Sequence, residues 1–142
     1  INEENGNRGG EKYAEIAARE LEAGENIYVA AMESDAGGFS PRGFSMDAPD
    51  DLVAQVKEWA PLFEPYNIHR FKKGWSGVDI GPLKELKKRP FLIGLVPDGQ
   101  RYFDFHHSSS DVFENVHKRE LELGAGTMAS MIMLIDKYIP AP

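Results

Sequence analysis

The spacing of apolar and polar positions predicts helices that alternate with short buried strands along the whole chain. Four segments are expected to be helical, residues 11–23, 49–63, 82–88 and 115–138. Unbroken apolar runs occupy residues 27–32 and 91–96, a pattern typical of strands buried on both faces of a mainly parallel sheet. Shorter extended pieces are expected at residues 68–71 and 102–105, and a loop rich in Gly, Ser and Pro at residues 36–47. The predicted fold class is therefore α/β, with a mostly parallel sheet and helices on both faces.

Composition excludes several classes of protein. The chain has 142 residues, of which 42% are hydrophobic, so a single globular domain is the simplest expectation. A formal net charge of −7 argues against a nucleic-acid partner, because binding to the phosphate backbone requires a basic surface. No apolar run reaches the roughly 18 residues of a membrane span. The lack of cysteine in the sequence excludes disulfide bonds, thiolate zinc sites and a cysteine nucleophile.

Polar residues directly after the apolar runs are the strongest candidates for chemistry, because ligands in open α/β sheets bind beyond the carboxyl ends of strands. Glu33 and Asp35 follow the first buried run, and His106 and His107 follow the last expected extended piece, residues 102–105. Glu3 and Glu4 would join them if a strand ran just before the first residue. Taken singly, each has an ordinary structural interpretation, such as a solvated surface pair or a loop hydrogen bond.

Taken together, these residues form a pattern that suits metal-assisted hydrolysis. Two carboxylates and an imidazole are ligands that zinc accepts in catalytic sites. A second glutamate beside a ligating one is free to take a proton from water and pass it to the leaving amine. His69 and His117 lie in charged segments and are assigned no role.

Four ordered motifs resemble the C-terminal part of the di-zinc aminopeptidase/carboxypeptidase family, closest to its carboxypeptidase-Q-like branch. They are NEENG at residues 2–6, ESDAG at 33–37, GVDIGPL at 77–83 and FHHSSSD at 105–111. The resemblance covers nearly the whole chain and implies a zinc exopeptidase-like three-layer sandwich whose N-terminal part is missing. Residues 1–142 would then be the C-terminal portion of a single peptidase catalytic domain.

The resemblance also implies a role for each matching residue. Glu3 matches the general base, Glu4 and His107 match ligands of the first zinc, and Asp35 matches a ligand of the second. The implied activity is that of an aminopeptidase or dipeptidase, a zinc metallopeptidase that hydrolyses a peptide substrate near a chain end. Zinc would stabilise the tetrahedral oxyanion while Glu3 takes the proton from the attacking water.

Three further residues near these motifs have weaker assignments. Asp111 is expected to steady the histidine loop, as partners of metal ligands commonly do. His106 is expected to face away from the metal or to line the pocket. Asp79 is expected to border the substrate pocket, although a turn held by an Asx hydrogen bond is an equally good interpretation.

The chain also departs from the family pattern. A His-x-Asp motif and a carboxylate that bridges the two metals belong upstream of the Glu-Glu pair, where this sequence has only Ile1 and Asn2. The first metal would keep two protein ligands and the second one, whereas a catalytic zinc normally keeps three. The chain alone is therefore expected to bind zinc weakly or in part, to hydrolyse nothing, and to need the N-terminal part of the same domain as its partner. The family also implies a secreted, periplasmic or membrane-attached protein.

Two alternative functions remain open from the sequence. The parent protein would be a binding module if it were an inactive relative of these peptidases, although its retained Glu3, Glu4, Asp35 and His107 argue against this. The same scaffold also supports a transferase reaction, glutaminyl cyclisation, with similar carboxylate and histidine ligands. The carboxypeptidase-Q-like motifs disfavour that second alternative.

Overall fold

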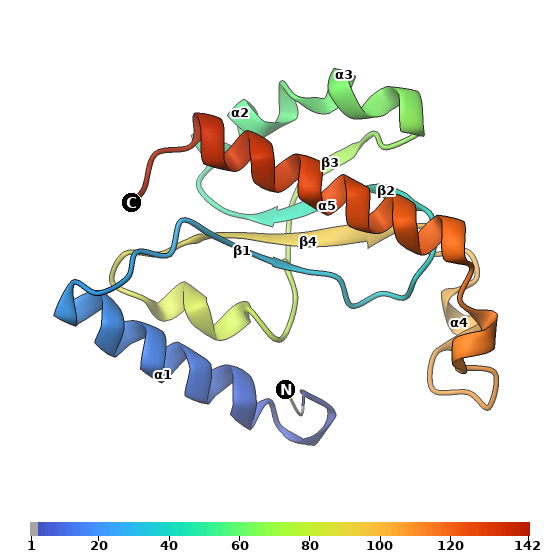
Figure 1. Cartoon of the computed structure of the whole chain (residues 1–142), viewed down its shortest axis with the longest axis horizontal. Helices are drawn as coiled ribbons and strands as arrows, with labels where there is room; N and C mark the ends of the chain where they lie inside the picture. Colours follow the sequence, from blue (N-terminus) through green and yellow to red (C-terminus); the bar gives the residue numbers. More distant parts are fainter. Residues whose placement is uncertain (1–2) are drawn as a thin grey trace.

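A four-stranded mixed sheet lies between two layers of helices in the computed structural model, which describes residues 3–142 (Figure 1). The strands, in the order β1-β4-β2-β3 across the sheet, are Ala30–Glu33, Phe91–Pro97, Pro41–Asp47 and Arg70–Lys73. β1 runs parallel to β4 and β2 parallel to β3, whereas β2 and β4 are antiparallel. Two of the three pairings are parallel, and the predicted α/β class with helices on both faces is confirmed.

Helices cover the two faces of the sheet unequally. The long α5, Lys118–Tyr138, and the shorter α2, Asp50–Lys57, lie over one face, while α1, Arg8–Ala23, and the 3-10 segment η3, Gly81–Glu85, lie over the other (Figure 1). The remaining elements are short: η1 at Glu3–Asn5, α3 at Ala60–Phe63, η2 at Glu64–Tyr66, α4 at Tyr102–Phe105 and η4 at Phe113–Asn115. Within residues 3–142, no helix combines the length and apolar character needed to cross a membrane.

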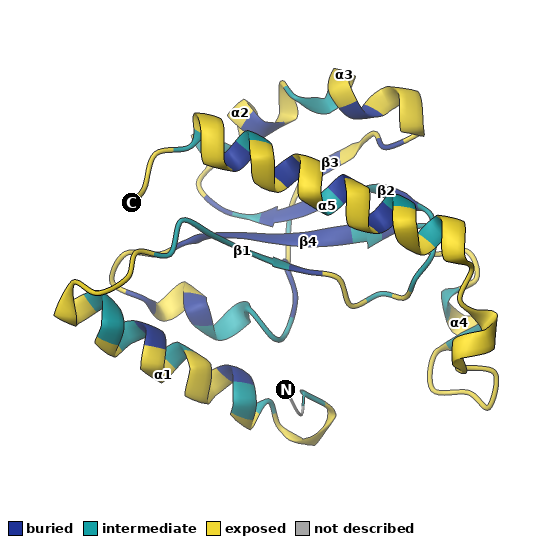
Figure 2. Ribbon diagram, viewed as in Figure 1, coloured by how far each residue is buried: buried dark blue, intermediate teal, exposed yellow. Residues whose placement is uncertain are grey.

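The two faces of β4 are packed into two separate cores, which explains its unbroken apolar run. Ile93 is buried in the larger core, together with Phe44 and Met46 of β2 and Met131 of α5. Leu92 points to the other face, into a smaller core beneath α1 and η3. Successive side chains of a strand point to opposite faces, so both kinds of position must be apolar in β4. Figure 2 shows the central strands buried along their length and α5 buried only on its inner side.

Some elements differ from those expected from the sequence. Residues 41–47 were expected to be a loop but form β2. Only Phe44 and Met46 of this strand face the larger core, and its Pro, Arg, Gly, Ser and Asp residues hide the strand pattern. Residues 102–105 were expected to be extended but form one helical turn, α4, and so add no strand to the sheet. The helix expected at 49–63 is divided into α2 and α3 because Pro61 cannot donate the hydrogen bond that would continue it.

An ion pair joins the end of β4 to β2. Arg42 Nη2 lies 2.9 Å from Asp98 Oδ2, and the backbone N–H of Gln100 donates a hydrogen bond of 3.1 Å to Asp98 Oδ1. The Gln100 hydrogen bond, followed by the Arg42 interactions, lowers the pKa of Asp98, against a smaller opposing effect of desolvation. A carboxylate whose pKa is lower in the folded state stabilises the fold fully above its unfolded pKa and loses that effect as the pH falls.

We therefore expect Asp98→Asn to lower the urea midpoint at pH 7, and the difference from the wild type to shrink as the pH falls below about 4. Urea unfolding at a series of pH values measures this difference. The exposed Glu25→Gln variant is a matched control and should follow the wild type. A difference that stayed constant down to pH 3 would contradict the role assigned to Asp98.

Candidate metal-binding site

A hollow of about 280 Å³ lies beyond the carboxyl ends of β1 and β4. Five of the residues singled out in the sequence line it, namely Glu4, Asp35, His106, His107 and Asp111. β1 and β4 are parallel neighbours, so the segments that follow them emerge at the same edge of the sheet. Segments 70 residues apart along the chain are brought together in this way.

The imidazole of His107 and the carboxylate of Glu4 are in direct contact. His107 Nε2 lies 3.4 Å from Glu4 Oε1, and both side chains are more than half exposed. Two donors that each lie about 2.0–2.1 Å from a tetrahedral zinc ion are about 3.3–3.4 Å from each other. The pair therefore has the separation that two ligands of one zinc ion require.

The backbone at His107 is left-handed, with φ of 53°, which is uncommon for a residue other than glycine. This bend directly follows α4 and gives the two adjacent histidines different surroundings. The His106 ring stacks on Tyr102 of α4, with ring centroids 4.6 Å apart and 21° between the planes. The His107 ring stands nearly perpendicular to that of His106 and makes the contact with Glu4. Such strained conformations cluster at functional sites, where the surrounding structure holds them in place.

Glu33, two residues before Asp35, was noted in the sequence as a polar residue at a strand end but was assigned no role. Its side chain is buried, and its carboxylate accepts hydrogen bonds of 3.1 Å from the backbone N–H groups of Val78 and Ile80. Burial raises the pKa of Glu33, and the nearby charges of Asp79 and Asp35 raise it further, while the two backbone hydrogen bonds oppose this effect. Glu33 thus holds the loop of residues 74–80 against the end of β1. Its position at the end of an apolar strand was visible in the sequence, but its backbone partners in a distant loop were not.

Two of the predicted site residues lie outside the hollow. Glu3 is half-buried in η1, where its backbone carbonyl accepts hydrogen bonds from the N–H groups of Gly6 and Asn7. Asp79 lies in the loop of residues 74–80, and its Oδ1 is buried without a hydrogen-bond partner among residues 3–142. His117, to which the sequence assigned no role, does line the hollow, from the position before the first residue of α5. Because His117 is an exposed residue in a charged segment, nothing in the sequence marks it.

The described part of the chain does not form a complete metal site. Across residues 3–142, no three His, Asp or Glu side chains are close enough to hold one metal ion together. Among the side chains that line the hollow, Glu4 and His107 are in direct contact, and Asp35 lines the same hollow.

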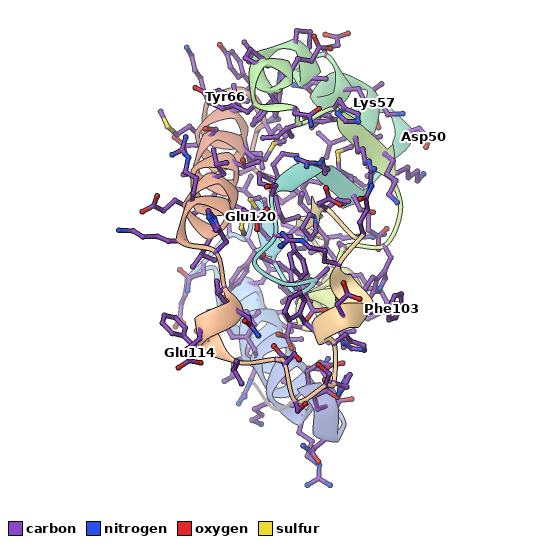
Figure 3. The ribbon with its side chains drawn as sticks, turned by 90° about the vertical axis from the view of Figure 1, so that its right-hand side faces the viewer. Asp50, Lys57, Tyr66, Phe103, Glu114 and Glu120 are labelled. Carbon is purple, nitrogen blue, oxygen red and sulfur yellow. The ribbon has the colours of Figure 1, made fainter. Side chains whose placement is uncertain are left out.

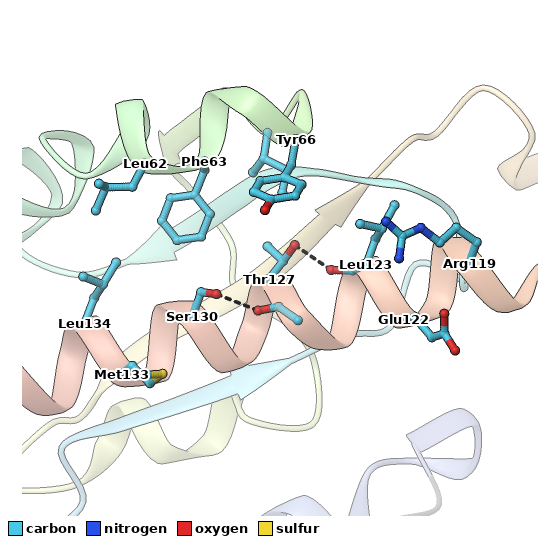
Figure 4. Close-up of a pocket in the computed structure, with 12 residues that line it drawn as sticks. Leu62, Phe63, Tyr66, Arg119, Glu122, Leu123, Thr127, Ser130, Met133 and Leu134 are labelled. Atoms are coloured by element: carbon cyan, nitrogen blue, oxygen red, sulfur yellow. Dashed lines mark hydrogen bonds between the residues drawn. The ribbon is translucent and has the colours of Figure 1, made fainter.

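Two other depressions differ in character from this hollow. A groove of about 600 Å³ runs between α5 and the α3–η2 segment and is lined largely by apolar side chains (Figure 4). Its hydroxyl groups on Thr127 and Ser130 donate hydrogen bonds within α5, to the carbonyls of Leu123 and Gly126 (Figure 4).

A second hollow, of about 520 Å³, adjoins the candidate metal site and shares Asp35 and Tyr102 with it. Figure 3 shows Phe103, which borders this second hollow, on α4 at the same end of the molecule as Glu114 of η4.

Comparison with known proteins finds relatives that are named carboxypeptidase Q. No family model matches the chain. Carboxypeptidase Q from Bos taurus is 28% identical over 134 residues, which are 89% of this chain and 26% of that protein. The Mus musculus protein of the same name is 27% identical over 148 residues, covering 97% of this chain and 29% of the relative. Carboxypeptidase Q from Xenopus laevis is 31% identical over 77% of this chain and 22% of its own length.

A solved structure shares the fold. The crystal structure of a peptidase M28 precursor from Shewanella amazonensis superposes with a TM-score of 0.79 and 25% sequence identity, over 96% of this chain and 31% of that one. This chain therefore spans less than a third of each protein that it matches here. The predicted resemblance to the aminopeptidase/carboxypeptidase family, closest to its carboxypeptidase-Q-like branch, is confirmed for a part of such a domain.

Proposed function

We propose that the complete protein is a metal-dependent exopeptidase and that this chain contributes part of its zinc site. The observation that carries the proposal is the contact between Glu4 and His107, 3.4 Å apart beyond the carboxyl ends of two parallel strands. Similarity to carboxypeptidase Q and to an M28 peptidase structure supports the same conclusion.

The donors in the hollow suit zinc. An imidazole nitrogen and carboxylate oxygens are the ligands that catalytic zinc sites use when thiolates are lacking. Glu4 and His107 would hold one ion and Asp35 would contribute to a second, with the remaining ligands supplied by parts of the complete protein that precede this chain. Bound zinc supplies Lewis acidity, which polarises the peptide carbonyl and makes water a better nucleophile.

Residues of this chain have the remaining roles in the proposed reaction. Glu3 stands next to Glu4 in η1 and is proposed to accept the proton of the attacking water and to deliver it to the leaving amine. The left-handed bend at His107 and the stacking of His106 on Tyr102 fix the direction of the ligating imidazole. Glu33 fixes the loop of residues 74–80 against the strand end from which Asp35 extends.

The two adjacent histidines provide a sharp test of the zinc site. In the complete protein, His107→Ala should weaken binding of one zinc ion by more than about 100-fold, because even the loss of a residue that supports a metal ligand weakens binding by 10–100-fold. His106→Ala is the matched control and should change zinc affinity far less, because its ring packs on Tyr102. Titration of the metal-free protein with zinc in a calorimeter measures both affinities.

The outcomes separate the proposal from its alternatives. Equal effects of the two substitutions would contradict the assignment of His107 as a ligand. A protein that binds zinc but hydrolyses no peptide would be a binding module, contrary to the proposal. Cyclisation of a peptide with N-terminal glutamine, without peptide-bond hydrolysis, would make the protein a transferase.

A further inference from the structure

The 520 Å³ hollow beside the candidate metal site combines positive charge with exposed aromatic rings, and we call it the basic hollow. Its cationic side chains come from β3: Arg70, Lys72 and Lys73. Two aromatic side chains border it, Trp75 at 65% exposure and Phe103 at 83%. Large aromatic side chains with so much exposed surface are typical of binding sites.

The positive charge in the basic hollow is largely unneutralised. Lys73 Nζ is paired with Asp50 Oδ1 at 2.6 Å, outside the hollow. Within residues 3–142, neither Lys72 nor Arg70 makes an ion pair. The charge of Arg70 acts on Asp98 only from a distance, where it helps to lower the pKa of that carboxyl group. Phe71 between them is buried in the larger core, so the alternation of a strand turns Arg70 and Lys72 to the opposite face, where the hollow lies. These two side chains are therefore available to an anion.

The acidic residues of the hollow lie at its other end. Glu33 is buried and its carboxylate is already engaged with the backbone of Val78 and Ile80. Asp35 is shared with the candidate metal site. The hollow thus runs from the metal-binding end at β1 to the cationic end at β3, across the order β1-β4-β2-β3. Three strand spacings of about 4.8 Å give about 14 Å for this path, the length of about four extended peptide residues.

We propose that the basic hollow binds a carboxylate of the peptide substrate, with Arg70 and Lys72 as its partners and Trp75 and Phe103 as apolar walls. The inference rests on the proposed exopeptidase function and specifies its substrates as short peptides with a negative charge up to about four residues from the cleaved bond. The carboxylate belongs either to an acidic side chain or to the C-terminus of a short peptide, and the same guanidinium and ammonium groups recognise both.

Peptide binding to the complete protein after removal of metal by a chelator tests the inference without requiring hydrolysis. Three tetrapeptides serve as probes: AAEA with an amidated C-terminus, AAQA with an amidated C-terminus, and AAQA with a free C-terminus. We expect at least one of the two carboxylate peptides to bind roughly tenfold more tightly than amidated AAQA. An advantage of amidated AAEA identifies the side chain as the source of the carboxylate, and an advantage of free AAQA identifies the C-terminus.

Charge-neutral variants connect this preference to the hollow. Arg70→Gln combined with Lys72→Gln should bring the affinity ratio between carboxylate and neutral peptides close to one. Lys57→Gln, an exposed lysine on α2, is the matched control and should keep the wild-type ratio. Higher salt should also reduce the ratio, because screening weakens exposed charge interactions.

The two proposals fail in different ways. Equal binding of all three peptides, or a preference that survives the double substitution, overturns the basic hollow even if the metal-loaded protein hydrolyses peptides. Preferential binding of a carboxylate peptide by a protein that hydrolyses none of them retains the basic hollow as a binding site and refutes the exopeptidase function.

Discussion

Replacing Glu3 with glutamine should remove nearly all hydrolytic activity from the complete protein while its zinc content stays unchanged. Glutamine has nearly the shape of glutamate but cannot accept the proton of the attacking water. General-base catalysis typically accounts for a factor of about 100 to 10,000 in rate, and we expect kcat to fall within that range. Peptide hydrolysis rates, with zinc measured by elemental analysis on the same samples, test the prediction.

The neighbouring glutamate provides the contrast. Glu4→Gln should lower zinc affinity as well as activity, because Glu4 Oε1 contacts the imidazole of His107. Glu11→Gln, an exposed residue in the first turn of α1, should change neither property. If Glu3→Gln retained more than about a tenth of the wild-type rate, Glu3 would not be the general base. Loss of zinc in this variant would instead indicate that Glu3 is a ligand.

Alanine at position 43 should destabilise the fold by about 3 kcal/mol or more. A Cβ atom on Gly43 would lie 1.9 Å from the backbone carbonyl oxygen of Arg70, and Gly43 has a positive φ of 156°. The two residues are directly paired between β2 and β3, so neither backbone can move away without breaking that pairing. Urea unfolding of the purified chain, compared with the wild type, measures the loss.

Gly126 is the matched control for Gly43. A Cβ on Gly126 would meet no atom within 4 Å, and the residue lies inside α5. Gly126→Ala should therefore increase stability by up to about 1 kcal/mol, because alanine favours a helix interior over glycine. A Gly43→Ala protein within 1 kcal/mol of the wild type would mean that β2 and β3 are less closely paired than the structure shows.

Much of the fold could be predicted from the sequence, in the segments where a single local pattern such as an apolar run is clear. The run Phe91–Val96 predicted β4 nearly to the residue, and Gly24 after a helical stripe predicted the end of α1. β2 was not predicted, because Gly43 and Ser45 flank Phe44, one of its two core residues, and resemble loop composition. Gly43 is present because the strand needs close approach to Arg70, a requirement that involves a residue 27 positions away.

Part of the candidate site could also be placed from the sequence. Asp35 follows the apolar strand β1, so its place at the carboxyl edge of the sheet could be predicted from the sequence. His107 reaches the same edge, but it follows the helical turn α4 and not the strand that was expected at residues 102–105. The role of Glu33 was not predicted, because its hydrogen-bond partners Val78 and Ile80 are more than 40 residues away in a loop without regular periodicity. His117 was also passed over, because only the packing of α5 beside the histidine loop brings it to the hollow.

The sequence by itself determined which residues end the buried strands and the chemical type of the groups there, because strand burial and ligand chemistry are properties of short segments. The tertiary structure decided the antiparallel insertion of β2, the contact of Glu4 with His107 and the cationic end of the basic hollow. Each of these depends on which distant segments become neighbours. Which distant segments become neighbours depends on how well the whole arrangement buries the two cores. The pattern of a single segment does not contain this information.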